Sequence, residues 1–145
     1  MNMNAQAYNQ YKKTSVETVA PEKLLIMLFD GAIKDINNAK KAIEAKDINL
    51  AHQEIIKAED ILIELMSTLN MDYEISLNLF ALYEYLLYQL TQANYKKDIA
   101  LLNEVEEFLT EIRQTWAEVA KAVKTTPTLA SKANEAAPGT INVKG

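Results

Sequence analysis

Histidine and carboxylate side chains are the groups of this sequence that could transfer a proton or a phosphoryl group. There is one histidine, His52, and no cysteine, which excludes disulfides, thiolate metal ligands and thiol nucleophiles together. Adjacent carboxylates occur at Glu59 with Asp60 and at Glu106 with Glu107. Both pairs fall on predicted polar helix faces, where solvated surface carboxylates are far more common than acid–base pairs. We therefore expect no catalytic residues and no enzyme.

His52 raises one specific alternative, a histidine phosphotransfer signalling domain in which the imidazole carries a phosphoryl group. An acidic four-helix bundle would suit that function, and the chain has a formal net charge of −5. In such domains a lysine and a small residue follow the histidine closely, whereas here Gln53, Glu54, Ile55 and Ile56 follow it. The Glu54 carboxylate would repel an incoming phosphate. Phosphotransfer through His52 stays an alternative, as does a self-contained structural bundle.

Metal and cofactor sites have no support in the sequence. A di-iron helical bundle needs two Glu-x-x-His pairs on facing helices, and one histidine cannot supply them. No glycine-rich phosphate-binding loop is present either. We therefore expect neither a metal nor a cofactor.

The acidic balance of the chain also limits its partners. Because phosphate contacts require clustered Lys and Arg, we expect no nucleic acid. The longest apolar run, residues 24–29, is far too short for a membrane span, and the first residues lack the apolar core of a signal peptide. The absence of cysteine suits a reducing compartment. We expect a cytoplasmic protein without direct membrane insertion.

Backbone breakers are nearly absent from the middle of the chain. From residue 22 to residue 126 there is no proline and one glycine, Gly31, which suggests close approach by another backbone, inside a bundle in preference to a partner. Pro21 suits a first helical turn, and Asp47, Asp72 and Asp98 can accept the free N–H groups where a helix restarts. Apolar residues recur every three or four positions, which predicts helices near 21–46, 48–70, 73–95 and 99–124. Their similar lengths and short connections predict an all-α protein, an antiparallel up-down four-helix bundle that is monomeric when free.

The two ends of the chain differ from its middle. Residues 1–20 are rich in Asn, Gln, Ser and Thr and carry Tyr8 and Tyr11, whereas residues 125–145 lack large apolar clusters. We expect a flexible N-terminal arm at 1–20, a bundle domain at 21–124 and a disordered tail at 125–145. The tyrosines of the arm could lie along an apolar surface of the bundle.

The predicted third helix, 73–95, is apolar on two faces. One face, with Ile75, Tyr83, Leu86 and Leu90, is the expected core stripe. A surface helix should carry charge on the opposite face, yet leucine, alanine and tyrosine dominate there. This helix is therefore either central in the fold or binds a partner. The partner-binding candidates, from this helix, the first helix and the arm, are Tyr8, Tyr11, Leu24, Met27, Leu77, Phe80, Ala81, Tyr85, Tyr88 and Tyr95.

The most specific motifs are SVETVAPEKLLIMLFDGAI at 15–33, IIKAEDILIELMSTL at 55–69, LFALYEYLLYQLTQAN at 79–94 and LLNEVEEFL at 101–109. Together with Tyr11, Asp98 and Trp116, these motifs resemble the flagellar export chaperones called FliS. The start of the first helix departs mildly from the family, because Ala20 and Pro21 lack an intervening hydroxyl residue and Phe29 replaces a tyrosine. The turn before the third helix also differs from the family's Gly-Gly-Glu-Ile.

The resemblance implies a cytoplasmic chaperone that binds the disordered C-terminal segment of flagellin. Such a chaperone would prevent premature polymerisation and deliver flagellin to the flagellar type III export gate, where it would meet the cytoplasmic domain of a membrane protein. The resemblance also suggests that the N-terminal arm covers the binding surface when flagellin is absent. An amphipathic cargo of this kind calls for a long apolar surface and no catalytic centre.

Overall fold

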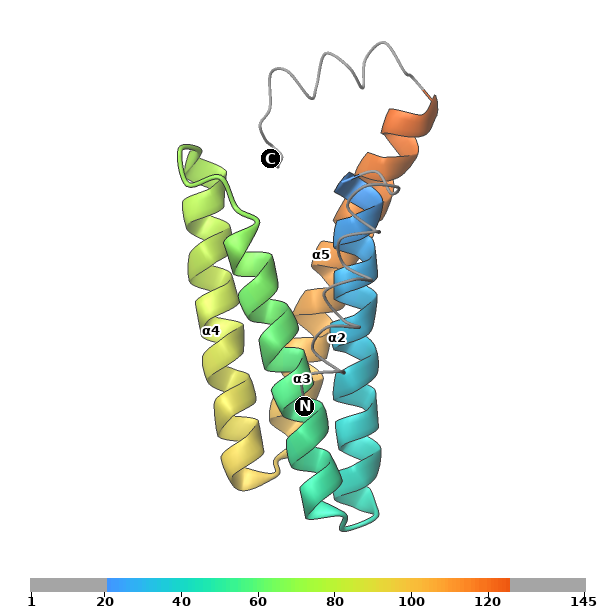
Figure 1. Cartoon of the computed structure of the whole chain (residues 1–145), viewed down its shortest axis with the longest axis vertical. Coiled ribbons are helices and arrows are strands. Elements are labelled where there is room, and N and C mark those ends of the chain that lie inside the picture. The colour runs from blue at the N-terminus through green and yellow to red at the C-terminus, as the bar shows by residue number, and fades with distance from the viewer. Residues whose placement is uncertain (1–20, 126–145) are drawn as a thin grey trace, which may run out of the picture.

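The computed structural model describes residues 21–125, with side chains to residue 122, and within that range every regular element is an α-helix (Figure 1). The helices are α2 (Pro21–Glu44), α3 (Ile48–Ser67), α4 (Glu74–Lys96) and α5 (Ile99–Thr125). The four predicted helices are confirmed. The predicted arm and tail, with Tyr8 and Tyr11, lie outside the described residues and stay predictions.

The helices form a ring of antiparallel neighbours. Each helix packs on the two beside it, α2 and α4 both on α3 and α5, whereas the diagonal pairs do not approach each other closely along the backbone. Successive helices run in opposite directions in Figure 1. This arrangement confirms the antiparallel up-down bundle. Within the described residues, no helix combines the length and hydropathy that a membrane span requires.

Two of the three predicted aspartate caps are present. Asp47 accepts a hydrogen bond from the backbone N–H of Leu50 at 3.1 Å, and Asp98 accepts one from Ala100 at 2.9 Å. The prediction for Asp72 is wrong, because the N-cap position of α4 is Tyr73 and no side chain caps it. Asp72 precedes the cap by one residue, so its carboxylate is not placed to reach the first-turn N–H groups.

Helices α2 and α3 end earlier than predicted, at turns where other groups satisfy the last carbonyls. After α2, Asp47 donates its backbone N–H to Ala42 at 2.8 Å while Lys46 adopts a positive φ of 62°. At the end of α3, the hydroxyls of Ser67 and Thr68 bond to carbonyls of the preceding turn, both at 2.7 Å. Such bonds replace the next helical hydrogen bonds and stop the helix.

Aromatic side chains of two diagonal helices meet inside the core. There Phe29 of α2 and Tyr83 of α4 meet with ring centroids 6.5 Å apart, and both are buried. Burial raises the pKa of the Tyr83 hydroxyl well above its ordinary value. The other fully buried large side chains are Ile36, Ile55, Leu62, Leu65, Leu86, Leu90, Leu102, Val105 and Leu109.

The predicted core stripe of α4 is wrong at its start. Ile75 is 51% exposed and Ser76 is buried in its place. Near this end of the bundle the α3–α4 pair diverges from the α2–α5 pair (Figure 1), and Leu69 and Trp116 are only half-buried. The stripe therefore fails at Ile75, whereas Leu79 and Leu82, which it also contains, pack half-buried against the core, and Tyr83, Leu86 and Leu90 are buried.

Candidate partner-binding surface

Exposed apolar side chains follow the outer face of α4 along most of its length. Leu77 is 54% exposed, Tyr88 59% and Tyr95 85%, and Ala81 is exposed between them. From Leu77 to Tyr95 a helix rises about 27 Å. Single exposed apolar side chains are common on protein surfaces, but several in a row on one face are typical of an interaction site. The sequence-based selection of these four residues therefore matches an exposed face of the bundle.

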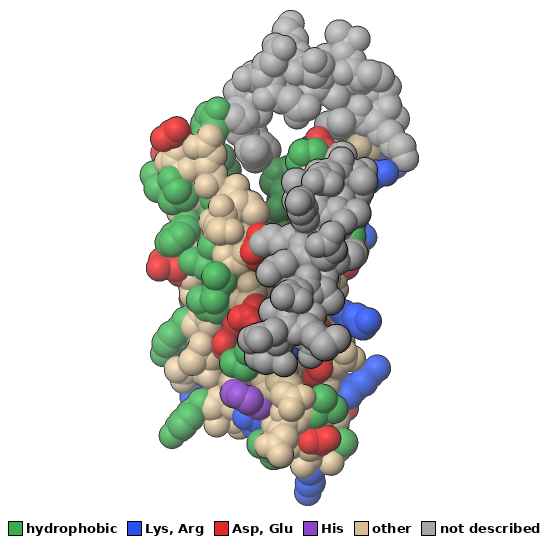
Figure 2. Space-filling view, in the orientation of Figure 1, with side chains coloured by type: hydrophobic (Ala, Val, Ile, Leu, Met, Phe, Trp, Pro, Cys, Tyr) green, Lys and Arg blue, Asp and Glu red, His purple; other side chains and the backbone are tan. Residues whose placement is uncertain are grey.

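Two isoleucines of α3 extend this face and were not among the predicted site residues. Ile56 and Ile63 are 36% and 52% exposed and lie about one turn before and after Glu59. Glu59 accepts a hydrogen bond from the Thr91 hydroxyl of α4 at 3.3 Å, so this side of α3 faces α4. Figure 2 shows hydrophobic side chains gathered over these two helices. We call Ile56, Ile63, Leu77, Ala81, Tyr88 and Tyr95 the apolar strip.

Tyr85 and Phe80 have partly internal roles. The Tyr85 hydroxyl donates to Glu104 of α5 at 2.6 Å. The Tyr85 ring packs edge-to-face on Phe108 of α5, with the ring centroids 6.4 Å apart. The hydrogen bond raises the pKa of Tyr85 and lowers that of Glu104. Tyr85 thus helps to join α4 to α5, although 43% of it is exposed. Phe80 is half-buried.

Leu24 and Met27 lie on α2, which does not pack on α4. Leu24 is half-buried and Met27 is 36% exposed. Helix α3 lies between α2 and α4, so the structure does not bring these two residues together with the α4 residues. The sequence pattern selected apolar residues on α2 and on α4, but only the packing order of the helices shows that these two sets lie on separate faces.

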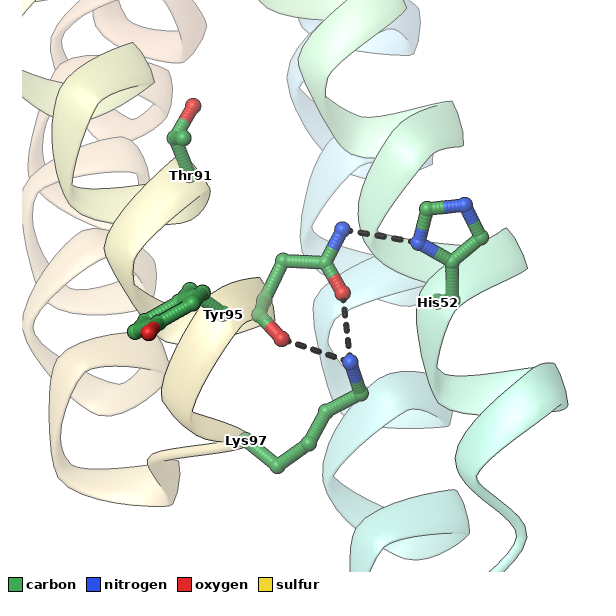
Figure 3. A pocket seen from close by; sticks show the side chains of 5 residues that line it. His52, Thr91, Tyr95 and Lys97 are labelled. Atoms are coloured by element: carbon green, nitrogen blue, oxygen red, sulfur yellow. Dashed lines mark hydrogen bonds between the residues drawn. The ribbon is translucent and has the colours of Figure 1, made fainter.

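His52 lies at the lower end of the strip, in a shallow pocket with Thr91, Asn94, Tyr95 and Lys97 (Figure 3). The Asn94 side chain bonds to His52 Nδ1 at 2.9 Å. The Lys97 ammonium donates to Asn94 Oδ1 at 2.8 Å and to its backbone oxygen at 2.5 Å. Although no lysine closely follows His52 in the sequence, Lys97 lines the same pocket and is linked to the imidazole through Asn94.

This hydrogen-bond chain determines which nitrogen of His52 is free. A lysine ammonium can only donate, so Asn94 must present its oxygen to Lys97 and its NH₂ group to His52. Nδ1 of His52 then accepts, and the proton of the neutral ring lies on Nε2. Neither nitrogen offers an unengaged lone pair to a phosphoryl group. The arrangement disfavours phosphotransfer.

Comparison with known proteins decides the family. The family model described as flagellar protein FliS matches residues 4–123. The chain is 40% identical over 109 residues to the flagellar secretion chaperone FliS of Bacillus subtilis, which covers 75% of this chain and 82% of the relative. The chain belongs to the FliS family. The flagellar secretion chaperone FliS of Vibrio cholerae is 36% identical over 115 residues, which cover 75% of this chain and 85% of the relative. The FliS of Salmonella typhimurium is 32% identical over 122 residues, which cover 79% of this chain and 90% of the relative.

Membership of the FliS family also answers the question of enzymatic activity, because these chaperones are not enzymes. In each carboxylate pair noted in the sequence one member, Asp60 or Glu107, is exposed, and the other is half-buried and bonded, Glu59 to Thr91 and Glu106 to Lys40. Within the described part of the chain, no cluster of three or more His, Asp and Glu side chains could hold a metal ion. The features left to explain are the apolar strip and the pocket at its end.

Proposed function

We propose that this protein is a cytoplasmic secretion chaperone that holds the disordered C-terminal segment of flagellin against the apolar strip. The observation that carries the proposal is the continuous row of exposed apolar side chains on α4 and α3. Family membership supplies the class of cargo, since the relatives are flagellar secretion chaperones.

The strip suits an amphipathic polypeptide better than a small molecule. It extends for about 27 Å along α4, so a compact ligand would cover only a small part of it. A segment that becomes helical along α4 could place one apolar side chain on the strip at every turn. About 18 residues of helix would cover the distance from Leu77 to Tyr95. Tyr88 and Tyr95 combine a large apolar ring with a polar tip, which suits a surface that is sometimes free and sometimes covered.

The bound segment would then be kept from polymerising until it reaches the flagellar export gate. In this proposal a free monomer meets flagellin in the cytoplasm and later contacts the cytoplasmic domain of an export-gate membrane protein. The acidic charge of −5 would keep a chaperone with an exposed apolar strip from associating with itself.

The test uses charge placed on the strip. Leu77→Asp and Tyr88→Glu should each weaken binding of a flagellin C-terminal peptide at least tenfold, because a carboxylate would have to be desolvated against apolar cargo (about 1.4 kcal/mol or more). Isothermal titration calorimetry gives the affinity, and circular dichroism reports the gain of helix on binding.

Gln114→Glu is the matched control. Gln114 is exposed on α5, away from the strip, and the substitution adds the same charge as Tyr88→Glu. It should leave affinity within about twofold of the wild type. If both strip variants stay folded and bind the peptide as tightly as Gln114→Glu does, flagellin lies elsewhere on the bundle.

A further inference from the structure

The pocket of His52, Thr91, Asn94, Tyr95 and Lys97 contains a cation, Lys97, that no carboxylate of residues 21–122 pairs with. Lys97 is half-buried, and its ammonium donates to two neutral oxygens of Asn94. Lys40, Lys57 and Arg113, in contrast, each lie within ion-pair distance of a carboxylate. No such carboxylate lies beside Lys97 among the described residues. A partly desolvated ammonium in this position favours an incoming anion.

The backbone holds Lys97 in this position. It is the C-cap residue of α4, with a φ of 51°, and its N–H donates to the carbonyl of Ala93. This left-handed turn directs the side chain back over the last turn of α4, where both Asn94 oxygens hold its ammonium. Two of the three ammonium protons are used, which leaves one for a ligand.

The pocket is continuous with the apolar strip. Tyr95 belongs to the strip and also lines the pocket, and Thr91 is one turn from Tyr88 (Figure 3). A polypeptide that follows α4 along the strip therefore arrives at Lys97. Glu59 is an acidic group beside the pocket; it is bonded to Thr91, and its pKa is raised chiefly by burial. One carboxylate can approach Lys97 beside Glu59, whereas a phosphate dianion would meet stronger repulsion.

We propose that Lys97, held by Asn94, binds a carboxylate of the polypeptide that lies along the apolar strip. This inference rests on the proposed function and adds a specificity-determining residue to it. The hydrophobic strip accepts many amphipathic sequences, so the ion pair would fix the register and direction of the bound segment. The carboxylate belongs either to the chain terminus of the cargo or to an Asp or Glu side chain.

The experiment compares Lys97→Met with Lys96→Met in the full chain. Lys96 is the neighbouring exposed lysine, so both variants lose the same charge at nearly the same place. With a synthetic peptide of the flagellin C-terminus as probe, Lys97→Met should lower affinity about fivefold and Lys96→Met by less than twofold. Lys97→Gln, which retains a donor for Asn94, should show the same loss as Lys97→Met, and thermal unfolding checks that α4 stays folded.

Two modified peptides identify the carboxylate. One carries a C-terminal amide and the other carries Asn and Gln in place of Asp and Glu. The peptide that lacks the relevant carboxylate should bind the wild type about fivefold more weakly and no longer respond to Lys97→Met. The inference would be overturned if Lys97→Met and Lys96→Met lowered affinity equally, or if Lys97→Met lowered affinity for both modified peptides as much as for the unmodified one. Either result would leave the proposed function standing. Failure of the unmodified peptide to bind the wild type would remove the proposed function as well.

Discussion

Two buried carboxylates, Asp35 of α2 and Glu54 of α3, share one lysine at the interface between these helices. Lys57 Nζ lies 3.1 Å from Glu54 and 3.7 Å from Asp35, and Asn38 donates to Glu54 at 3.3 Å. Burial is the main cause that raises the pKa of Asp35 to about 6; Glu54 adds to the shift and Lys57 opposes it. One ammonium thus compensates two carboxylates only in part.

Asp35→Asn should therefore change how stability depends on pH. Between about pH 4 and pH 6 the folded wild type holds a proton on Asp35 that the unfolded chain has lost, so this group's contribution to stability falls as pH rises. An amide does not titrate. The free energy of unfolding of Asp35→Asn relative to wild type should rise by on the order of 2 kcal/mol across that window and then level off. Urea unfolding of both proteins at pH 4 and pH 7 measures this difference in the free energy of unfolding. A difference that stays constant or falls as pH rises would contradict the account.

Gly31, the one glycine of the described helices, lies on the face of α2 that packs on Ile61 of α3. A Cβ built on Gly31 would lie 3.2 Å from Ile61 Cδ1, which is the far end of a half-buried side chain. The sequence-based interpretation of Gly31 as a close-packing position inside the bundle agrees with this geometry, but the group that approaches it is a flexible side-chain tip rather than another backbone.

Gly31→Ala should be tolerated and Gly31→Leu should not. Alanine gains about 1 kcal/mol in helix propensity, and a small rotation of Ile61 can relieve the contact. We expect Gly31→Ala to change the free energy of unfolding by between 0 and about +1 kcal/mol. Leucine adds three further carbons at the interface and should destabilise by about 2 kcal/mol. Denaturant unfolding tests both, and a loss of more than about 1 kcal/mol for Gly31→Ala would mean that Ile61 cannot move.

At the level of elements, periodicity and capping residues predicted the number, order and approximate bounds of the helices. They could not show that the helix pairs diverge at one end of the bundle. For that reason Ile75, which is exposed there, was assigned to the core. They also could not place Lys97 near His52. Asn94, which links the two, lies 42 residues from His52 in sequence, and the contact depends on the left-handed turn at Lys97.

Between described residues, the ion pairs that join two helices all involve α2, whereas large exposed apolar side chains gather on α3 and α4. Helices α2 and α5 are joined by Lys40 with Glu106 at 2.5 Å and by Arg113 with Asp30 at 2.8 Å. The outer face of α3 and α4 carries the apolar strip instead. The sequence already indicated excess apolar surface on α4, because a helix that is apolar on two faces can turn only one of them to the core. Only the order in which the helices pack shows that Leu24 and Met27 lie apart from that surface and that Ile56 and Ile63 belong to it.

The most direct test of the strip as the binding surface is a titration monitored by isoleucine methyl NMR. Ile56 and Ile63 lie on the strip, whereas Ile33 is half-buried on α2. A flagellin C-terminal peptide should shift the methyl signals of Ile56 and Ile63 strongly and that of Ile33 weakly, because only the first two would be covered. Large shifts at Ile33 with unchanged signals at Ile56 and Ile63 would show that the cargo binds a different face of the bundle.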